Sequence, residues 1–228
     1  MKKHGKIYNE IIKQIDRSKL YDLKEAVELI KNIKGRKFDE TVELAVNLGI
    51  DPKQTDQNVR GTVVLPHSLG KQVKVLVFTK NEKEALEAGA DYAGGEELVN
   101  KILGGWIDFD TVIATPDLMG MVSKLGKVLG PKKLMPNPKL GTVTFDIARA
   151  VKEAKAGKVE IKNDKGGVVH VVLGKKSFEA NKLIENFNAI MEKIKSLKPA
   201  KSKGQFLKSA YISTTMGPSL KIAVQSYR

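Results

Sequence analysis

The stretch from Thr41 to Ile50, Thr-Val-Glu-Leu-Ala-Val-Asn-Leu-Gly-Ile, alternates between apolar side chains and polar or small ones. An extended chain points successive side chains to opposite faces, so this period of two predicts a strand with one buried face. The buried face gathers Val42, Leu44, Val46, Leu48 and Ile50. A strand that is buried on one face only is typical of an antiparallel sheet.

The chain on both sides of this strand has a compatible pattern. Apolar residues at helical spacing predict helices over residues 6–17 and 22–34. Near the other end, the pattern predicts a hairpin with strands from Val159 and over 168–173, a helix over 179–197, and a final strand pair joined around 213–219. Strands of this kind with amphipathic helices indicate helices packed on one face of an antiparallel sheet.

The middle of the chain has a different pattern. Val73–Phe78 is a short apolar run, as expected for a strand buried on both faces. Another strand over 111–115 alternates with predicted helices over 82–88, 96–103, 117–125 and 146–156, which favours a parallel, doubly wound sheet. Residues 126–141 are rich in Gly, Pro and Lys and cannot hold a long regular element.

These patterns predict a two-domain α/β protein. Residues 1–67 and 158–228 would form one discontinuous α+β two-layer domain, and residues 68–157 would form an inserted, Rossmann-like three-layer α/β domain.

The charge of the chain indicates its class of partner. Its 228 residues include 40 Lys and Arg and 26 Asp and Glu, a formal charge of +14. A soluble chain this basic usually binds a polyanion, either nucleic acid or an anionic membrane face. Residues 67–159 hold 14 basic and 11 acidic side chains, a net of +3, and the remaining residues carry +11. We therefore expect the polyanion site in the domain built from the two ends.

Several other classes are disfavoured. No apolar run reaches the roughly 18 residues of a membrane helix, and no apolar segment follows the basic start, so neither a membrane span nor a secretory signal is expected. The absence of cysteine excludes disulfides and thiolate metal sites, and it fits a reducing compartment.

Catalytic motifs are missing as well. The three histidines lie far apart in sequence, and no His-Glu-x-x-His or Gly-x-Ser-x-Gly pattern occurs, so no metal, cofactor or enzymatic activity is expected. The segment Gly120–Val128 misses the phosphate-loop pattern in its glycine spacing and its last residue. A nucleotide-binding enzyme that uses the middle domain remains the main alternative, on fold analogy alone. A general polyanion or membrane-surface binder is a third hypothesis.

The scarcity of aromatic residues favours one mode of nucleic-acid recognition. Aromatics make up 6% of the chain, and Phe78, Phe145 and Phe187 occupy positions expected in the core. Base stacking on a strand face is therefore not the main mode. Recognition of a folded RNA by its shape, phosphates and ribose hydroxyls remains.

The turn between the last two predicted strands fits this mode. Ser213 and Thr215 share one strand face, and their hydroxyls can both donate to and accept from a ribose 2′-OH. Met216 offers an adaptable apolar surface, and Gly217 with Pro218 lets bare backbone approach the RNA. The alternative is a plain hairpin whose threonines merely favour a strand.

Two further segments could join this turn. Lys37, Phe38 and Thr41 offer a cation, a ring and a hydroxyl, although the side chain of Phe38 could instead be buried in the hydrophobic core. The turn Asn163–Gly167 offers Lys165 and close backbone approach, or it is an ordinary Asx-Gly turn. Carboxylates in these segments can only accept hydrogen bonds, so they would contact amines or hydroxyls rather than phosphates; they are Glu40, Glu43 and Asp164.

Together the motifs resemble a known family, that of large-subunit ribosomal protein one of bacterial type, part of the mobile ribosomal stalk. The matching runs are Phe38–Glu43, Gly49–Pro52, Asp56–Val63, Leu65–His67, Gly89–Tyr92, Ala114–Asp117, Leu129–Pro131, Met135–Lys139, Asn163–Lys165 and Thr214–Ser219. They cover nearly the whole chain in the family's order.

The resemblance implies a structural protein of the large ribosomal subunit in the cytoplasm, monomeric off the ribosome. It implies that the first domain binds 23S ribosomal RNA, that a similar structure on the protein's own operon messenger is bound to repress translation, and that the stalk assists release of exit-site transfer RNA. The RNA contacts it implies are Lys37, Phe38, Thr41, Asp164, Lys165, Gly167, His170, Ser213, Thr215, Met216 and Gly217.

Overall fold

A computed structural model describes residues 5–33, 37–68, 70, 73–202 and 204–224. The chain divides into two compact units, Met1–Leu69 with Val159–Arg228 and Gly70–Lys158. The predicted α/β class is confirmed by the order of helices and strands. The assignment of separate domains to residues 1–67 with 158–228 and to 68–157 stays a prediction.

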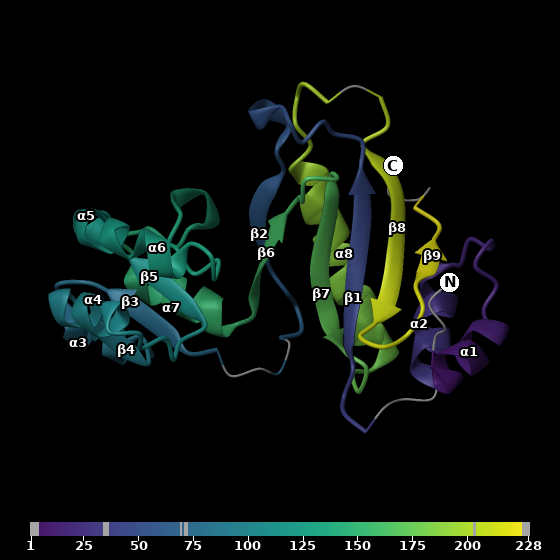
Figure 1. Cartoon of the computed structure of the whole chain (residues 1–228), viewed down its shortest axis with the longest axis horizontal. Coiled ribbons are helices and arrows are strands. Elements are labelled where there is room, and N and C mark those ends of the chain that lie inside the picture. The colour runs from purple at the N-terminus through teal and green to yellow at the C-terminus, as the bar shows by residue number, and fades with distance from the viewer. Residues whose placement is uncertain (1–4, 34–36, 69, 71–72, 203, 225–228) are drawn as a thin grey trace. The chain divides into compact units, whose positions relative to one another are not determined.

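The first unit is built on a four-stranded antiparallel sheet in the order β7-β1-β8-β9 (Figure 1). The strand quoted from the sequence is β1 (Thr41–Leu48), which has a neighbour on each side. Those neighbours are β7 (Val168–Lys175) and β8 (Leu207–Thr214), and β9 (Leu220–Ile222) follows at the edge. The even-numbered side chains of β1 are buried, as the period of two predicts.

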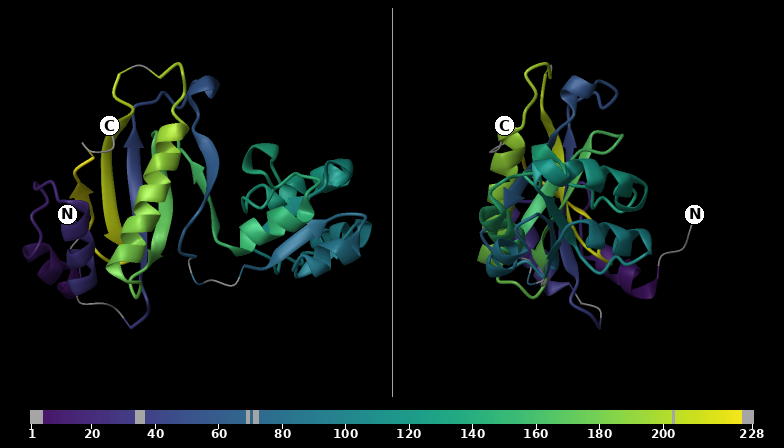
Figure 2. Two further views of the ribbon diagram at one scale, coloured as in Figure 1. Left: turned by 180° about the vertical axis from the view of Figure 1, so that it is seen from behind. Right: turned by 90° about the vertical axis from the view of Figure 1, so that its left-hand side faces the viewer.

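The described helices of this unit cover one face of the sheet. α8 (Ala180–Ser196) and α2 (Leu23–Asn32) pack against each other and against the strands, as the views of Figures 1 and 2 show. α1 (Lys6–Lys13) adds Ile11 to the same core. α1 ends before the predicted residue 17, and the predicted end of α2 at residue 34 lies outside the described residues. The opposite sheet face carries the remaining side chains of the strands, among them Glu43, His170 and Tyr211.

The two strands predicted on either side of residues 163–167 are present, but they pair with each other at a single bridge only, so the predicted hairpin pairing is wrong. β6 (Lys158–Lys162) pairs with β2 (Arg60–Val64) in a separate two-stranded sheet, and a single bridge, Asn163 to Val169, joins it to β7. Side-chain contacts favour the pairing of β6 with β2. Arg60 lies 3.0 Å from the Glu160 carboxylate, and the N–H of Val59 donates to Asn163 Oδ1. A 3₁₀ turn, η1 (Thr55–Gln57), precedes β2.

The second unit contains a three-stranded parallel sheet in the order β4-β3-β5. The strands are β3 (Val75–Phe78), β4 (Tyr92–Gly94) and β5 (Thr111–Ala114). Every residue of β3 is buried, as its apolar run predicts, because a separate apolar core lies on each face of the sheet. The three-layer arrangement predicted for the middle of the chain is therefore present.

The helices of this unit are divided between the two faces. One core contains α3 (Glu82–Glu87) and α7 (Ile147–Lys155), and the other contains α4 (Glu96–Leu103), α5 (Met119–Val122) and α6 (Gly126–Leu129). Short 3₁₀ turns complete the unit: η2 (Pro116–Leu118), η3 (Ser123–Leu125) and η4 (Pro138–Leu140).

One core prediction in this unit is wrong. Phe145 is 71% exposed, whereas Phe78 and Phe187 are fully buried as predicted. Phe145 stands just before α7, and its carbonyl accepts the N–H of Ile147. Ile147 fills the core of that sheet face, so the ring of Phe145 is left outside.

Candidate nucleic-acid interface

The antiparallel register brings two of the predicted segments together at one end of the first sheet. Val42 at the start of β1 pairs with Thr214 at the end of β8. Residues that precede β1 therefore lie beside residues that follow β8. We call this group the tip cluster; it consists of Lys37, Phe38, Thr41, Ser213, Thr215, Met216 and Gly217.

The segment before β1 is tied down by hydrogen bonds to β7 and the residues after it. Both oxygens of the Asp39 carboxylate accept from Ser177, one from its N–H and one from its hydroxyl at 2.7 Å. The carbonyl of Glu40 accepts the N–H of Lys176. Held in this way, Phe38 is 53% exposed. The alternative in which Phe38 plugs the core is therefore wrong.

Thr215 connects the two halves of the tip cluster. Its Oγ1 accepts the N–H of Thr41 at 3.0 Å and donates to the Thr41 carbonyl at 3.3 Å, while its own N–H also donates to that carbonyl. A hydroxyl has one proton and two lone pairs, so one lone pair of Thr215 stays available to an external donor. The residue thus has a structural role that the sequence did not predict.

Gly217 is required by the packing of the tip itself. A Cβ at this position would lie 2.3 Å from Thr214 Oγ1. That oxygen is buried and has no hydrogen-bond partner within the described part of the chain. The N–H of Met216 donates to the buried Glu40 carboxylate at 3.3 Å. Glu40 therefore holds the tip from inside, and it is not the external acceptor that the sequence predicted.

Sequence reasoning missed several side chains that lie next to the tip cluster. Lys175 Nζ donates to Thr41 Oγ1 at 2.9 Å, which adds a cation at Thr41 of the tip cluster. On the uncovered sheet face, Tyr211 stands opposite Ala45 in the register. The signal for Tyr211 was the alternation of its strand, since its neighbours Ala210 and Ile212 are buried. Lys175 follows a register shift between β1 and β7, so the alternation of β7 gave no such signal for it.

The third predicted segment does not join the tip cluster. Asp164, Lys165 and Gly167, which we call the turn cluster, lie at the start of β7, and Gly167 accepts the N–H of Leu48 at the far end of β1. Leu48 lies seven residues from Thr41 along β1, which at about 3.4 Å per residue is roughly 24 Å. His170 stands between them, exposed and opposite Ala45.

The turn cluster is shaped by its own hydrogen bonds. One oxygen of Asp164 accepts the N–H groups of Gly166 and Val168, each at 2.8 Å. The N–H of Val168 is the largest cause that lowers the pKa of this carboxyl below its usual 3.8, with further contributions from Gly166 and from nearby His170. Gly167 has φ +78, a conformation that other residues rarely adopt.

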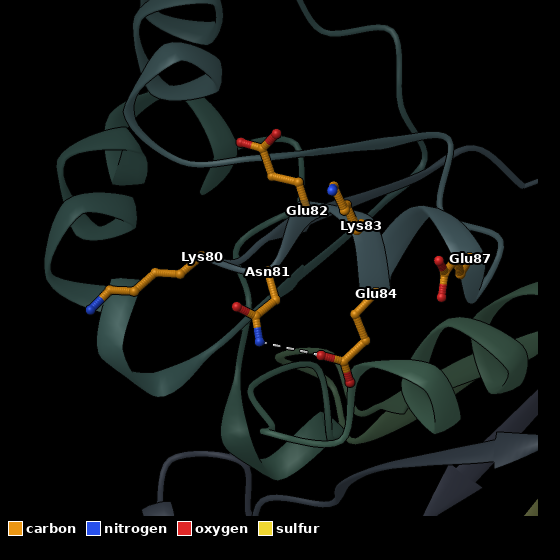
Figure 3. Close-up of a pocket in the computed structure, with 6 residues that line it drawn as sticks. All are labelled: Lys80, Asn81, Glu82, Lys83, Glu84 and Glu87. Atoms are coloured by element: carbon orange, nitrogen blue, oxygen red, sulfur yellow. Dashed lines mark hydrogen bonds between the residues drawn. The ribbon is translucent and has the colours of Figure 1, made fainter.

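In the described part of the second unit, the pocket at the expected ligand position does not suit a nucleotide. A pocket of about 580 Å³ lies at the carboxyl end of β3 (Figure 3), where doubly wound sheets usually bind ligands. Its lining is acidic, with Glu82, Glu84 and Glu87 against Lys80 and Lys83. A phosphate would be repelled by three carboxylates. Among the described residues, no group of three or more His, Asp or Glu side chains could hold a metal ion.

Comparison with known proteins identifies the family. The model of the ribosomal protein L1p/L10e family matches residues 29–218. The chain belongs to this family. Curated relatives named large ribosomal subunit protein uL1, from Thermus thermophilus and two of its strains, are 55% identical over 225 residues, which cover 97% of this chain and 98% of each relative.

Membership of the L1p/L10e family confirms several predictions made from the sequence. The chain is a structural ribosomal protein of the bacterial type rather than an enzyme, and its location is the cytoplasmic ribosome. The resemblance stated from the motifs is thus confirmed. Separately, none of the helices in the described ranges combines the length and the apolar character that a membrane span requires.

Proposed function

We propose that this chain is a component of the large ribosomal subunit that binds 23S ribosomal RNA at the mobile stalk through the tip cluster of its first unit. The names of its relatives, which place them in the large subunit, support the assignment. The observation that carries it is the tip cluster itself, where Phe38 and Met216 are about half exposed beside hydroxyls and lysines.

The chemistry of the tip cluster suits a folded RNA. Lys37 and Lys175 would neutralise phosphates, and the free lone pair of Thr215 would accept a ribose 2′-OH. The exposed side chains of Phe38 and Met216 would pack on a ribose or on an unstacked base. Because Asp39, Glu40 and Thr215 already fix the main chain, little ordering would be required on binding.

The uncovered sheet face would extend the interface toward the turn cluster. His170 lies on this face between the two clusters, and Lys165 is exposed at its far end. An RNA segment that crosses the sheet would contact both ends at once. All eleven residues named from the sequence then belong to one interface, with the tip cluster as its specific end and the turn cluster as a second anchor.

The further partners rest on the family resemblance. We propose that the chain binds a similar structure on its own operon messenger and represses translation, that the stalk assists release of exit-site transfer RNA, and that the chain is a monomer off the ribosome. If one site serves both RNAs, a messenger fragment should compete with the ribosomal fragment for the protein.

The binding test uses the exposed methionine. Met216→Asp places a negative charge in the tip cluster and should weaken binding of a stalk RNA fragment by about 1–3 kcal/mol, the usual scale for removal of a specific protein–RNA interaction. Leu103→Asp in the second unit is the matched control, because Leu103 is 55% exposed and Met216 is 49% exposed. Equal binding by both variants and the wild type would place the RNA site elsewhere.

A further inference from the structure

The second unit divides its charge unevenly along the chain. Residues 70–117 contain five Lys and nine Asp or Glu, a net of −4, whereas residues 118–158 contain nine Lys or Arg and two acids, a net of +7. Because the two net charges partly cancel, the small net charge of the whole unit does not reveal this uneven distribution. Between Asp117 and Asp146 the chain has five lysines and no acidic residue at all.

The lysines of this acid-free run are presented on the surface around α6. We define the lysine patch as Lys124, Lys127, Lys132 and Lys133, all of which are exposed. Lys124 and Lys127 are three residues apart on the continuous turns of η3 and α6, a spacing that places side chains on the same side. Within the described part of the chain, none of the four forms an ion pair.

Lys133 occupies a position that normally favours glycine. Its φ is 61, and it is the only residue other than glycine with a positive φ among those described. The turn follows the pattern of a helix end, since Lys133 N–H donates to the Gly130 carbonyl and Leu134 N–H to the Leu129 carbonyl. A side chain there strains the backbone, and such strain is concentrated at functional positions.

The helices that begin with glutamates lie on different faces of the sheet: α3 belongs to the core opposite α6, whereas α4 shares the core of α6. α3 and α4 begin with pairs of glutamates, in contrast to the acid-free segment around α6. The acid-free segment gives the surface around α6 a local excess of positive charge, which would attract a polyanion.

From these observations we propose that the lysine patch binds the phosphate backbone of duplex RNA without reading its sequence, as a second RNA surface separate from the tip cluster. Lysine suits this role because its ammonium is a flexible point charge without a preferred base partner. The patch adds affinity and salt dependence, while the tip cluster of the first unit supplies selectivity.

The test compares two quadruple variants of the full chain. In the first, the four patch lysines become glutamine. In the second, Lys74, Lys80, Lys83 and Lys101 become glutamine, which makes the same charge change in the same unit among carboxylates such as Asp108 and Glu82. The probe is an RNA duplex of unrelated sequence, followed by fluorescence anisotropy at several salt concentrations. Circular dichroism confirms that both variants are folded.

The patch variant should bind the duplex about 10-fold more weakly, and the slope of log affinity against log salt should fall by about 0.9 for each phosphate that the variant no longer neutralises. The control variant should bind like the wild type. Equal losses in both variants would show an effect of net charge alone, and unchanged binding by the patch variant would leave the surface to another partner, such as an acidic protein. Either result overturns the proposal.

A single substitution at Lys133 separates strain from binding. Lys133→Gly removes the strained side chain, so the melting temperature should stay the same or rise while affinity for the duplex falls. If affinity is unchanged, the residue has no part in binding. Met216→Asp is the complementary variant. It should lose selectivity for stalk RNA but bind the unrelated duplex as the wild type does. Failure of the proposed function and failure of the lysine-patch proposal can therefore be told apart.

Discussion

The two sheets of this protein differ in how their own helices cover them. In the first unit α2 and α8 cover one face of an antiparallel sheet, and the other face carries polar side chains. In the second unit helices cover both faces of a parallel sheet, and β3 is wholly buried. An uncovered strand face can present a fixed row of side chains to a partner, whereas a covered sheet leaves only its loops and helices for this purpose.

A core deletion in each unit gives the largest expected effect on this comparison. Phe78→Ala and Phe187→Ala each remove a fully buried ring and should cost about 3–5 kcal/mol of unfolding free energy in the unit concerned. Only Phe187→Ala should abolish binding of stalk RNA, because it destabilises the sheet that carries the tip cluster. Thermal unfolding and RNA affinity would be measured for both variants.

This pair of variants also tests the domain proposal. If Phe78→Ala loses stalk RNA as completely as Phe187→Ala does, then the two units do not fold separately, or the second unit carries the specific site. The expected outcome is that selective binding of stalk RNA is retained while the melting transition of the second unit is lowered.

A smaller effect is expected when the hydroxyl of Thr215, which joins the two segments of the tip cluster, is removed. Thr215→Ala removes the two bonds of Oγ1 with Thr41 and should lower the unfolding free energy by about 1 kcal/mol, the usual net value of a hydrogen bond. It should also weaken RNA binding. Thr215→Ser keeps the hydroxyl and should restore both quantities nearly to wild type. A serine variant as weak as the alanine variant would mean that the methyl group, and not the hydroxyl, matters.

The smallest effect concerns the turn cluster at low pH. The folded-state pKa of Asp164 is lowered below 3.8, so its carboxylate contributes stability above its unfolded pKa and loses it as the pH falls through the folded value. Asp164→Asn should therefore be less stable than wild type at neutral pH, and the difference should close below about pH 4, since an unperturbed Asp titrates near 3.9. Urea unfolding at several pH values measures it. A difference that is independent of pH would contradict the prediction.

Periodicity predicted the class of each sheet but not every strand in it. β1 has eight residues of clear alternation, and β3 is a clear apolar run. In contrast, β4 has three residues, and β2 contains Gly61, where a Cβ would lie 2.8 Å from Leu197. These short strands exist because of tertiary contacts, so a local pattern could not predict them. The same is true of the hairpin, where pairing with β2 replaced the nearer partner β7.

The types of residue at the candidate interface were predicted from the sequence better than their arrangement in space. The residue types named from the sequence are exposed at the tip, but the bonds that fix them join Thr41 to Thr215, 174 residues apart, and Asp39 to Ser177, 138 residues apart. Such pairs leave no local signal. Lys175 was missed for this reason. The turn cluster was grouped with the tip cluster in the prediction because the order of residues in the sequence does not show at which end of the sheet a turn lies.

The methionines provide the most direct test of the central claim. Met216 is half exposed in the tip cluster, Met191 is buried in the core of the same unit, and Met119, Met121 and Met135 belong to the second unit. The measurement is a methyl NMR titration of the methionine-labelled chain with a stalk RNA fragment. Binding at the tip cluster predicts that the Met216 signal shifts or broadens at stoichiometric RNA while Met191 stays in place. A Met216 signal that does not change while those of Met119, Met121 and Met135 move would contradict the account.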